Sequence, residues 1–113
     1  MINSYNKYDV VVVKFPFTDF SAIKARPVVV VSNSFYNENS RNDLIVMALS
    51  SQVQNKLPFE FEISEWENAG LLKPTILKSA IATVTSEIVL NKLGQLSAID
   101  IQKTENLLQK ILS

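Results

Sequence analysis

Arg26 is the residue whose type and position are best suited to chemistry, because it directly precedes Pro27. A residue before proline is biased toward an extended conformation, and the proline fixes the start of the segment that follows. The planar guanidinium can bind two phosphate oxygens at once, which a lysine ammonium cannot do. Arg26 could instead be structural and form an ion pair with Asp19 or Asp43. The residues alone leave both interpretations open.

Ser50 and Ser51 end an apolar segment and supply two neighbouring hydroxyl groups. A hydroxyl can donate a hydrogen bond to a phosphate oxygen. In a regular strand the two side chains would point to opposite faces, which makes Ser51 the weaker candidate. Both serines could also simply end the strand by bonding to nearby backbone. The chain has no cysteine and no histidine, so thiolate nucleophiles, imidazole acid–base catalysis and the usual Cys and His metal ligands are excluded.

The elements that must position these groups are mostly strands. Three segments rich in β-branched residues predict strands over residues 8–15, 27–33 and 43–51. Their apolar character is nearly continuous, which predicts burial on both faces of a closed or strongly curled sheet.

The second half of the chain adds further strands and one helix. Apolar and polar residues alternate over 58–64, which predicts a strand with one solvent face, and the segment 72–84 predicts another strand after Pro74. Residues 86–94 fit either a strand or a turn with a short helix. Ser97 is a candidate N-cap, with Asp100 three residues later. The apolar spacing after it predicts a C-terminal amphipathic helix. Its inner face would hold Ile101, Thr104, Leu108, Ile111 and Leu112.

Length and composition limit the architecture and the location. A chain of 113 residues predicts a single domain over 1–113, a mainly β small barrel with helical additions and with longer loops at 16–26 and 34–42. No apolar run approaches the roughly 20 residues that span a bilayer, and the first residues lack a signal pattern, so we expect a cytoplasmic protein without a membrane contact. Eleven basic and eleven acidic residues give no net charge, so any site for a polyanion must be local.

Four segments in order resemble the MazF/PemK family of toxins. They are VVVVKFPFTDFSAIKARPVVVVSNSFYN, ALSSQVQNKLPFEFEI, GLLKPTILKSAIATV and KLGQLSAIDIQKTENLLQKIL, which cover nearly the whole chain. The first contains the Arg-Pro dipeptide before an aliphatic strand, and the last contains the Leu-Gly-x-Leu turn before the closing helix. The resemblance implies the SH3-like, PemK/CcdB-type barrel.

The resemblance also implies an activity. Members of this family are toxins of type II toxin–antitoxin systems that cleave single-stranded messenger RNA without a metal or other cofactor, as homodimers neutralised by a cognate antitoxin protein. The 2′-hydroxyl attacks the adjacent phosphate and leaves a cyclic phosphate and a 5′-hydroxyl. Arg26 matches the family's principal catalytic residue, and Ser50 stands where a catalytic Thr is usual. Serine retains the hydroxyl but lacks the methyl group that restricts χ1.

Five further residues are candidate RNA contacts because they offer base stacking, amide hydrogen bonds or phosphate binding: Phe17, Lys24, Gln52, Lys56 and Lys78. Phe17 could equally belong to a small core or a dimer contact. Two other functions remain open. CcdB-like gyrase poisons share the fold but end in Trp-Gly-Ile, whereas this chain ends in a different sequence, and a non-catalytic SH3-like binding module is the third alternative.

Overall fold

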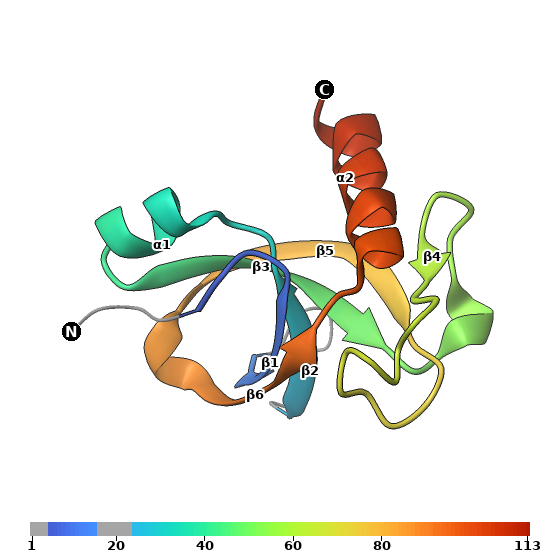
Figure 1. Cartoon of the computed structure of the whole chain (residues 1–113), viewed down its shortest axis with the longest axis horizontal. Coiled ribbons are helices and arrows are strands. Elements are labelled where there is room, and N and C mark those ends of the chain that lie inside the picture. Colours follow the sequence, from blue (N-terminus) through green and yellow to red (C-terminus); the bar gives the residue numbers. More distant parts are fainter. Residues whose placement is uncertain (1–4, 16–23) are drawn as a thin grey trace.

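A computed structural model describes residues 5–15 and 24–113 of the chain. Six antiparallel strands form one strongly curved sheet in the order β4-β5-β3-β2-β1-β6 (Figure 1). Their bounds are β1 (Asp9–Lys14), β2 (Ala25–Val30), β3 (Asp43–Ser50), β4 (Phe61–Glu62), β5 (Ile76–Thr85) and β6 (Val89–Gln95). Within the described ranges no ladder joins β4 to β6, so the sheet is curled but open at that seam. The mainly β fold with a C-terminal helix is confirmed.

The central strands are buried on both faces, as the valine runs predict. Val10 and Val29 belong to one apolar cluster and Val11 and Val28 to a second, and none of these four side chains is exposed. The register explains the division, because Val10 lies opposite Val29 and Val11 lies opposite Val28. Successive residues of a strand point to opposite faces, so each residue pair supplies one side of the sheet.

Two segments, 34–42 and 58–64, differ from their predicted structure, and a third, 86–94, combines the two alternatives that were left open. The expected loop over 34–42 contains a short helix, α1 (Ser34–Asn39), whose first turn is capped by the Asn33 side chain, which accepts a hydrogen bond from the Tyr36 N–H at 3.0 Å. The ambiguous segment 86–94 is a single 3-10 turn (Ser86–Ile88) followed by β6, which pairs with β1.

The strand predicted over 58–64 shortens to the two residues of β4. Its expected solvent face is also wrong at Glu60, which is buried, while Phe59 is 40% exposed. The Glu60 N–H donates to the Leu57 carbonyl at 3.0 Å and closes a turn, so the backbone does not enter the sheet until Phe61.

The C-terminal helix α2 (Ala98–Leu112) follows Ser97 as predicted and packs on the first of the two apolar clusters. Leu112 is 69% exposed rather than part of the inner face, and Leu107 is buried instead. The buried carboxylate of Asp100 accepts from the Ser64 and Glu65 N–H groups at 2.7 and 2.9 Å, which ties the helix to the segment after β4. No helix in the described part of the chain is long and apolar enough to cross a membrane.

The two ends of the described chain meet at this helix. The Lys7 ammonium lies 3.5 Å from the Glu105 carboxylate, and the Tyr8 hydroxyl donates to the same carboxylate. The Leu96 N–H donates to the Tyr8 carbonyl at 3.0 Å. The segment before β1 is therefore held by α2 and by Leu96, which lies between β6 and α2.

The only two glycines of the chain meet at one seam, between the segment before β5 and strand β6. Gly70 has a φ of +82°, and a Cβ there would lie 2.2 Å from the Leu93 carbonyl oxygen. A Cβ on Gly94 would lie 2.8 Å from the Ala69 carbonyl oxygen. Only glycine allows such an approach of two backbones, and the contact fixes the segment that leads into Lys73.

Candidate functional site

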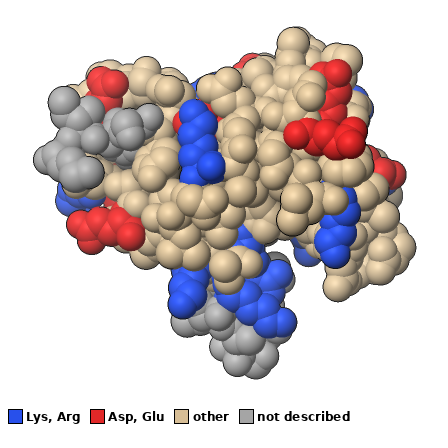
Figure 2. All heavy atoms as spheres, turned by 60° about the horizontal axis from the view of Figure 1, so that its bottom comes forward, with Lys and Arg blue, Asp and Glu red and all other residues tan. Residues whose placement is uncertain are grey.

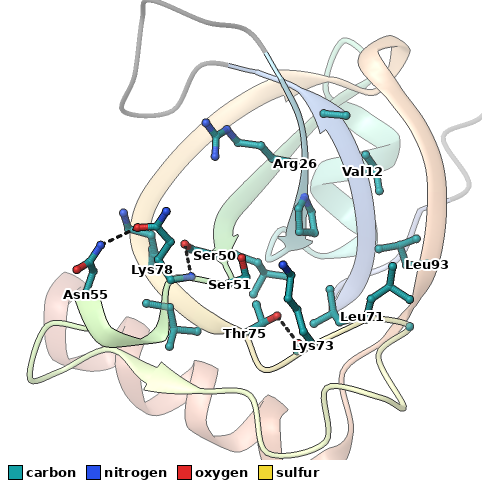
Figure 3. Close-up of a pocket in the computed structure, with 17 residues that line it drawn as sticks. Val12, Arg26, Ser50, Ser51, Asn55, Leu71, Lys73, Thr75, Lys78 and Leu93 are labelled. Carbon is teal, nitrogen blue, oxygen red and sulfur yellow. Dashed lines mark hydrogen bonds between the residues drawn. The ribbon is translucent and has the colours of Figure 1, made fainter.

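A cavity of about 680 Å³ opens where β2, β3 and β5 meet the segment before β5 (Figure 3). Four of the residues singled out in the sequence line it: Arg26, Ser50, Gln52 and Lys78. They come from three separate parts of the chain, and the curvature of the sheet brings them together. The remaining polar lining residues are Ser51, Asn55, Lys73 and Thr75.

Arg26 reaches into the cavity from the start of β2 (Figure 3), where it lies opposite Val13 of β1. Its side chain is half-buried, and within residues 5–15 and 24–113 no carboxylate lies within 4 Å of it. The proposed structural partner Asp43 lies at the far end of β3, opposite Thr85. The other proposed partner, Asp19, lies outside the described residues. The guanidinium is therefore directed at the cavity and is not neutralised by Asp43.

Ser50 is the last residue of β3 and lies opposite Ile76 of β5. Its Oγ accepts a hydrogen bond from the Gln52 N–H at 3.1 Å. That bond uses a lone pair of the oxygen and leaves the hydroxyl proton available to donate. Ser51, expected to point to the opposite face, also lines the cavity, because the regular strand ends at Ser50.

Gln52 and Asn55 form one side of the opening. Asn55 Nδ2 donates to Gln52 Oε1 at 2.8 Å across a 3-10 turn (Val53–Asn55). Each side chain keeps further hydrogen-bonding capacity, because an amide carries two N–H donors and a carbonyl oxygen with two lone pairs. This pair could contact base edges.

Two of the predicted RNA contacts do not line the cavity, and a third cannot be placed in the described part of the chain. Lys24 is exposed next to Ala25, and Lys56 is exposed with its ammonium donating to the Glu60 carbonyl at 3.3 Å. Phe17 lies outside the described residues.

Lys73, Thr75 and Asn55 are lining residues that the sequence-based selection missed. Lys73 is exposed, whereas Thr75 is buried and its Oγ1 donates to the Lys73 carbonyl at 2.8 Å. The signal for Lys73 was present in the Lys-Pro-Thr sequence before β5, which matches the family segment already noted. Asn55 and Thr75 had no comparable signal, because their contribution depends on how the turns pack.

The cavity lining contains three cations, Arg26, Lys73 and Lys78, and no carboxylate among the described residues. Figure 2 shows lysine and arginine side chains on both sides of a hollow at the lower edge of the molecule, with aspartate and glutamate side chains toward the periphery. Three positive charges at a partly enclosed surface attract an anion although the whole chain is neutral. Within the described part of the chain, no three His, Cys, Asp or Glu side chains are grouped to hold a metal ion.

Glu60 is the buried carboxylate beside this cationic group. It accepts hydrogen bonds from the Leu57 N–H at 3.0 Å and from the Ser79 N–H at 2.8 Å. Burial raises the pKa of Glu60, but the Leu57 and Ser79 N–H groups, the Ser79 hydroxyl and the charge of Lys78 outweigh it and lower the pKa below its ordinary value. Glu60 is therefore held as a carboxylate.

The geometry suits the binding of a phosphodiester. Arginine offers a planar pair of donors, the serine hydroxyl offers one neutral donor, and two lysines add charge at the rim. Donors fixed in this way can stabilise negative charge that develops during a displacement at phosphorus.

Comparisons with known proteins agree with the fold. The sequence model of the family described as "PemK-like, MazF-like toxin of type II toxin-antitoxin system" matches residues 6–112. No curated protein sequence matches the chain.

Several solved structures share the fold at low sequence identity. An endoribonuclease from a mycobacterial species superposes with a TM-score of 0.75 at 16% identity, covering 97% of this chain and 92% of that one. MazF (Form-I) from Deinococcus radiodurans gives 0.74 at 16% identity, covering 96% of both chains. A mycobacterial endoribonuclease in complex with its cognate antitoxin gives 0.71 at 17% identity, covering 96% and 92%. Because the family match spans all but a few terminal residues, this chain belongs to the family of PemK-like, MazF-like toxins of type II toxin–antitoxin systems.

Proposed function

We propose that the protein is a metal-independent endoribonuclease that cleaves single-stranded messenger RNA and thereby inhibits translation and growth. The observation that carries this proposal is the meeting of Arg26, Ser50 and Lys78 in one cavity without a carboxylate among its described lining residues. Structural neighbours described as endoribonucleases support it.

The proposed reaction is a transesterification within the RNA. The 2′-hydroxyl oxygen attacks the adjacent phosphorus, the bond from phosphorus to the 5′-oxygen breaks, and a 2′,3′-cyclic phosphate and a 5′-hydroxyl result. One proton leaves the 2′-oxygen and one is delivered to the 5′-oxygen. Arg26 and Ser50 act by donating to the non-bridging oxygens, where negative charge increases in the transition state. Arg26 does not act as the proton acceptor, because a guanidinium remains protonated in proteins.

The test is incubation of the purified protein with a long RNA in the presence of EDTA. We expect discrete fragments with cyclic phosphate and 5′-hydroxyl ends, and no fragments with Arg26→Ala. An intact RNA, or cleavage that requires an added divalent cation, would overturn the proposal. Intact RNA together with inhibition of DNA gyrase would favour the CcdB-like alternative.

We further propose that a cognate antitoxin neutralises the protein by placing an acidic, unfolded segment in the cationic cavity. Two neighbours, a mycobacterial endoribonuclease and MazF from Deinococcus radiodurans, were solved with an antitoxin. An acidic segment can replace phosphate charge and fold on binding. Competition between RNA and antitoxin in a binding assay is the expected result, and simultaneous binding would contradict the proposal.

A homodimer is the expected assembly, with RNA bound in a groove shared by both subunits. Leu72 is 95% exposed at the rim of the cavity, and Leu112 is 69% exposed on α2. The proposal is that a second subunit covers this exposed apolar surface. Light scattering at micromolar concentration should give twice the mass of the chain, and the mass of a monomer would count against the dimer.

A further inference from the structure

Strand β5 is continuous, but its pairing with β3 contains a bulge beside the cavity. Met47 of β3 lies opposite Ile81, but Leu49, two residues later, lies opposite Leu77. Three residues of β5, Lys78, Ser79 and Ala80, therefore face the single residue Ala48. Extra residues in one strand bend it and change the direction of their side chains, and such bulges are frequent next to active sites.

Glu60 occupies the position where the ladder between β4 and β5 stops. The last main-chain pairs are Glu62 with Ile76 and Phe61 with Leu77. Continuing that register by one step would place Glu60 opposite Lys78. At this step the Glu60 side chain replaces the main chain: its Oε2 accepts from the Ser79 N–H at 2.8 Å and from the Ser79 hydroxyl at 3.1 Å.

The second oxygen of the same carboxylate holds the opposite wall. Glu60 Oε1 accepts from the Leu57 N–H at 3.0 Å, and the Lys56 ammonium donates to the Glu60 carbonyl at 3.3 Å. Leu57 follows closely after the turn that carries Asn55. One buried carboxylate therefore connects the β5 bulge to the segment that forms the amide side of the cavity.

The Lys78 ammonium forms no ion pair with Glu60 among the described residues. It lines the cavity, and within residues 5–15 and 24–113 it has no carboxylate within 4 Å. Its charge contributes to the lowered pKa of Glu60 without a direct ion pair. The ammonium thus remains available to an anion in the cavity.

We propose that Glu60 is a positioning residue that fixes the β5 bulge and thereby directs Lys78 toward the phosphate backbone of the bound RNA. This inference rests on the proposed function and assigns a role to a residue outside the cavity lining. A carboxylate is required because three donors, on Leu57 and Ser79, converge on its two oxygens. Glutamine has only one acceptor oxygen, so its NH₂ group would face an N–H on one side and release either the bulge or the Leu57 turn.

The test uses the salt dependence of RNA binding. The probe is a fluorescent 2′-O-methyl oligoribonucleotide of mixed sequence, which cannot be cleaved because its 2′-oxygens are blocked, and anisotropy gives Kd over a range of NaCl concentrations. Each phosphate contact to single-stranded nucleic acid contributes about 0.7 to the slope of log Kd against log salt. We expect Lys78→Met to reduce the slope by about 0.7. Glu60→Gln should reduce the slope in the same direction, and Lys78→Met with Glu60→Gln should equal Lys78→Met alone.

Lys73→Met is the matched control. Lys73 also lines the cavity, but it lies outside the bulge and its side chain has no contact with Glu60 among the described interactions. The effects of Lys73→Met and Glu60→Gln should therefore add. Should Glu60→Gln fail to fold, Ser79→Ala removes one of the three hydrogen bonds and should give a smaller effect that disappears in the Lys78→Met background.

Two results would overturn the proposal. One is an unchanged salt slope in folded Glu60→Gln, and the other is full additivity of Glu60→Gln with Lys78→Met. Absence of RNA binding by the wild-type protein would instead refute the proposed function. In that case the ε-methylene NMR signals of the lysines test the positioning role of Glu60 independently of RNA. Glu60→Gln should shift the Lys78 signal and leave the Lys73 signal unchanged. An unmoved Lys78 signal would refute the positioning role.

Discussion

Replacement of Ser50 by alanine tests whether this hydroxyl takes part in RNA cleavage or only ends a strand. In the structure its oxygen accepts from the Gln52 N–H at 3.1 Å, and Gln52 is exposed. Water can replace that acceptor, so Ser50→Ala should cost only about 0.5 kcal/mol of folding stability, the lower end for a hydrogen bond. Loss of a donor to the transition state costs about 10²–10³ in rate, or roughly 2.7–4 kcal/mol. The catalytic effect should therefore greatly exceed the structural one.

The assay is single-turnover cleavage of one RNA, with thermal unfolding recorded for each variant. Ser51→Ala is the matched control, because Ser51 lines the same cavity and should change the rate little. Ser50→Thr retains the hydroxyl on a side chain with a stiffer χ1 and should preserve or raise the rate. A wild-type rate for Ser50→Ala, or equal losses for Ser50→Ala and Ser51→Ala, would refute the reasoning.

Three other predictions concern single residues. Arg26→Lys keeps the charge but loses the planar pair of donors, so its cleavage rate should fall nearly as far as that of Arg26→Ala, and a rate near wild type would exclude bidentate contact. Asp100→Ala leaves the Ser64 and Glu65 N–H groups without their carboxylate, and chemical denaturation should show a loss of about 3 kcal/mol, against a small loss for the exposed Asn106→Ala. Because the pKa of Glu60 is lowered in the folded state, its stabilising contribution is complete above the ordinary value of 4.5 and is lost as the pH falls through the folded value. Unfolding midpoints should therefore fall more steeply below about pH 4.5 in wild type than in Glu60→Gln, and parallel curves would contradict the role of this group.

The sequence predicts the central strands well because their signal is local. Valine runs over 8–15 and 27–33 have high β-propensity, and burial on both faces follows from their unbroken apolar character. β6 is harder to predict, because its partner β1 lies some eighty residues earlier and its own pattern is mixed. Helix α1 spans only six residues, which are too few to show a clear period in the sequence.

The 58–64 segment shows why a correct alternating pattern can give a wrong strand. Alternation predicts which side chains share a face, but it does not show that the Glu60 N–H closes a turn with Leu57. The carboxylate then enters the interior because Ser79 supplies two donors. From its type alone, a glutamate such as Glu60 is expected to face solvent. Its hydrogen-bond partner Ser79 lies outside the alternating segment, so the pattern could not predict its burial.

The sequence predicted the two proposed catalytic residues of the site but not all of the residues that surround them. Arg26 and Ser50 were identified because short motifs of the family carry them, and both line the cavity. Lys56 was selected for its charge, yet its ammonium donates to a carbonyl outside the cavity lining. Thr75 and Asn55 were missed, because whether a polar residue lines the cavity depends on how the turns pack. The relevant segments are the turn after β3 and the segment before β5, where Gly70 approaches Leu93.

The sheet order has a consequence for the synthesis of the chain. β1 lies between β2 and β6, and the segment before β1 is held by Glu105 of the last helix. During synthesis, the second edge of β1 therefore stays uncovered until β6, some eighty residues later in the chain, has emerged. A nascent chain cannot complete the domain while its C-terminal helix is still inside the ribosome. The cavity that holds Arg26 and Ser50 is therefore completed only after β6, which supplies Leu93 to its lining, has been synthesised.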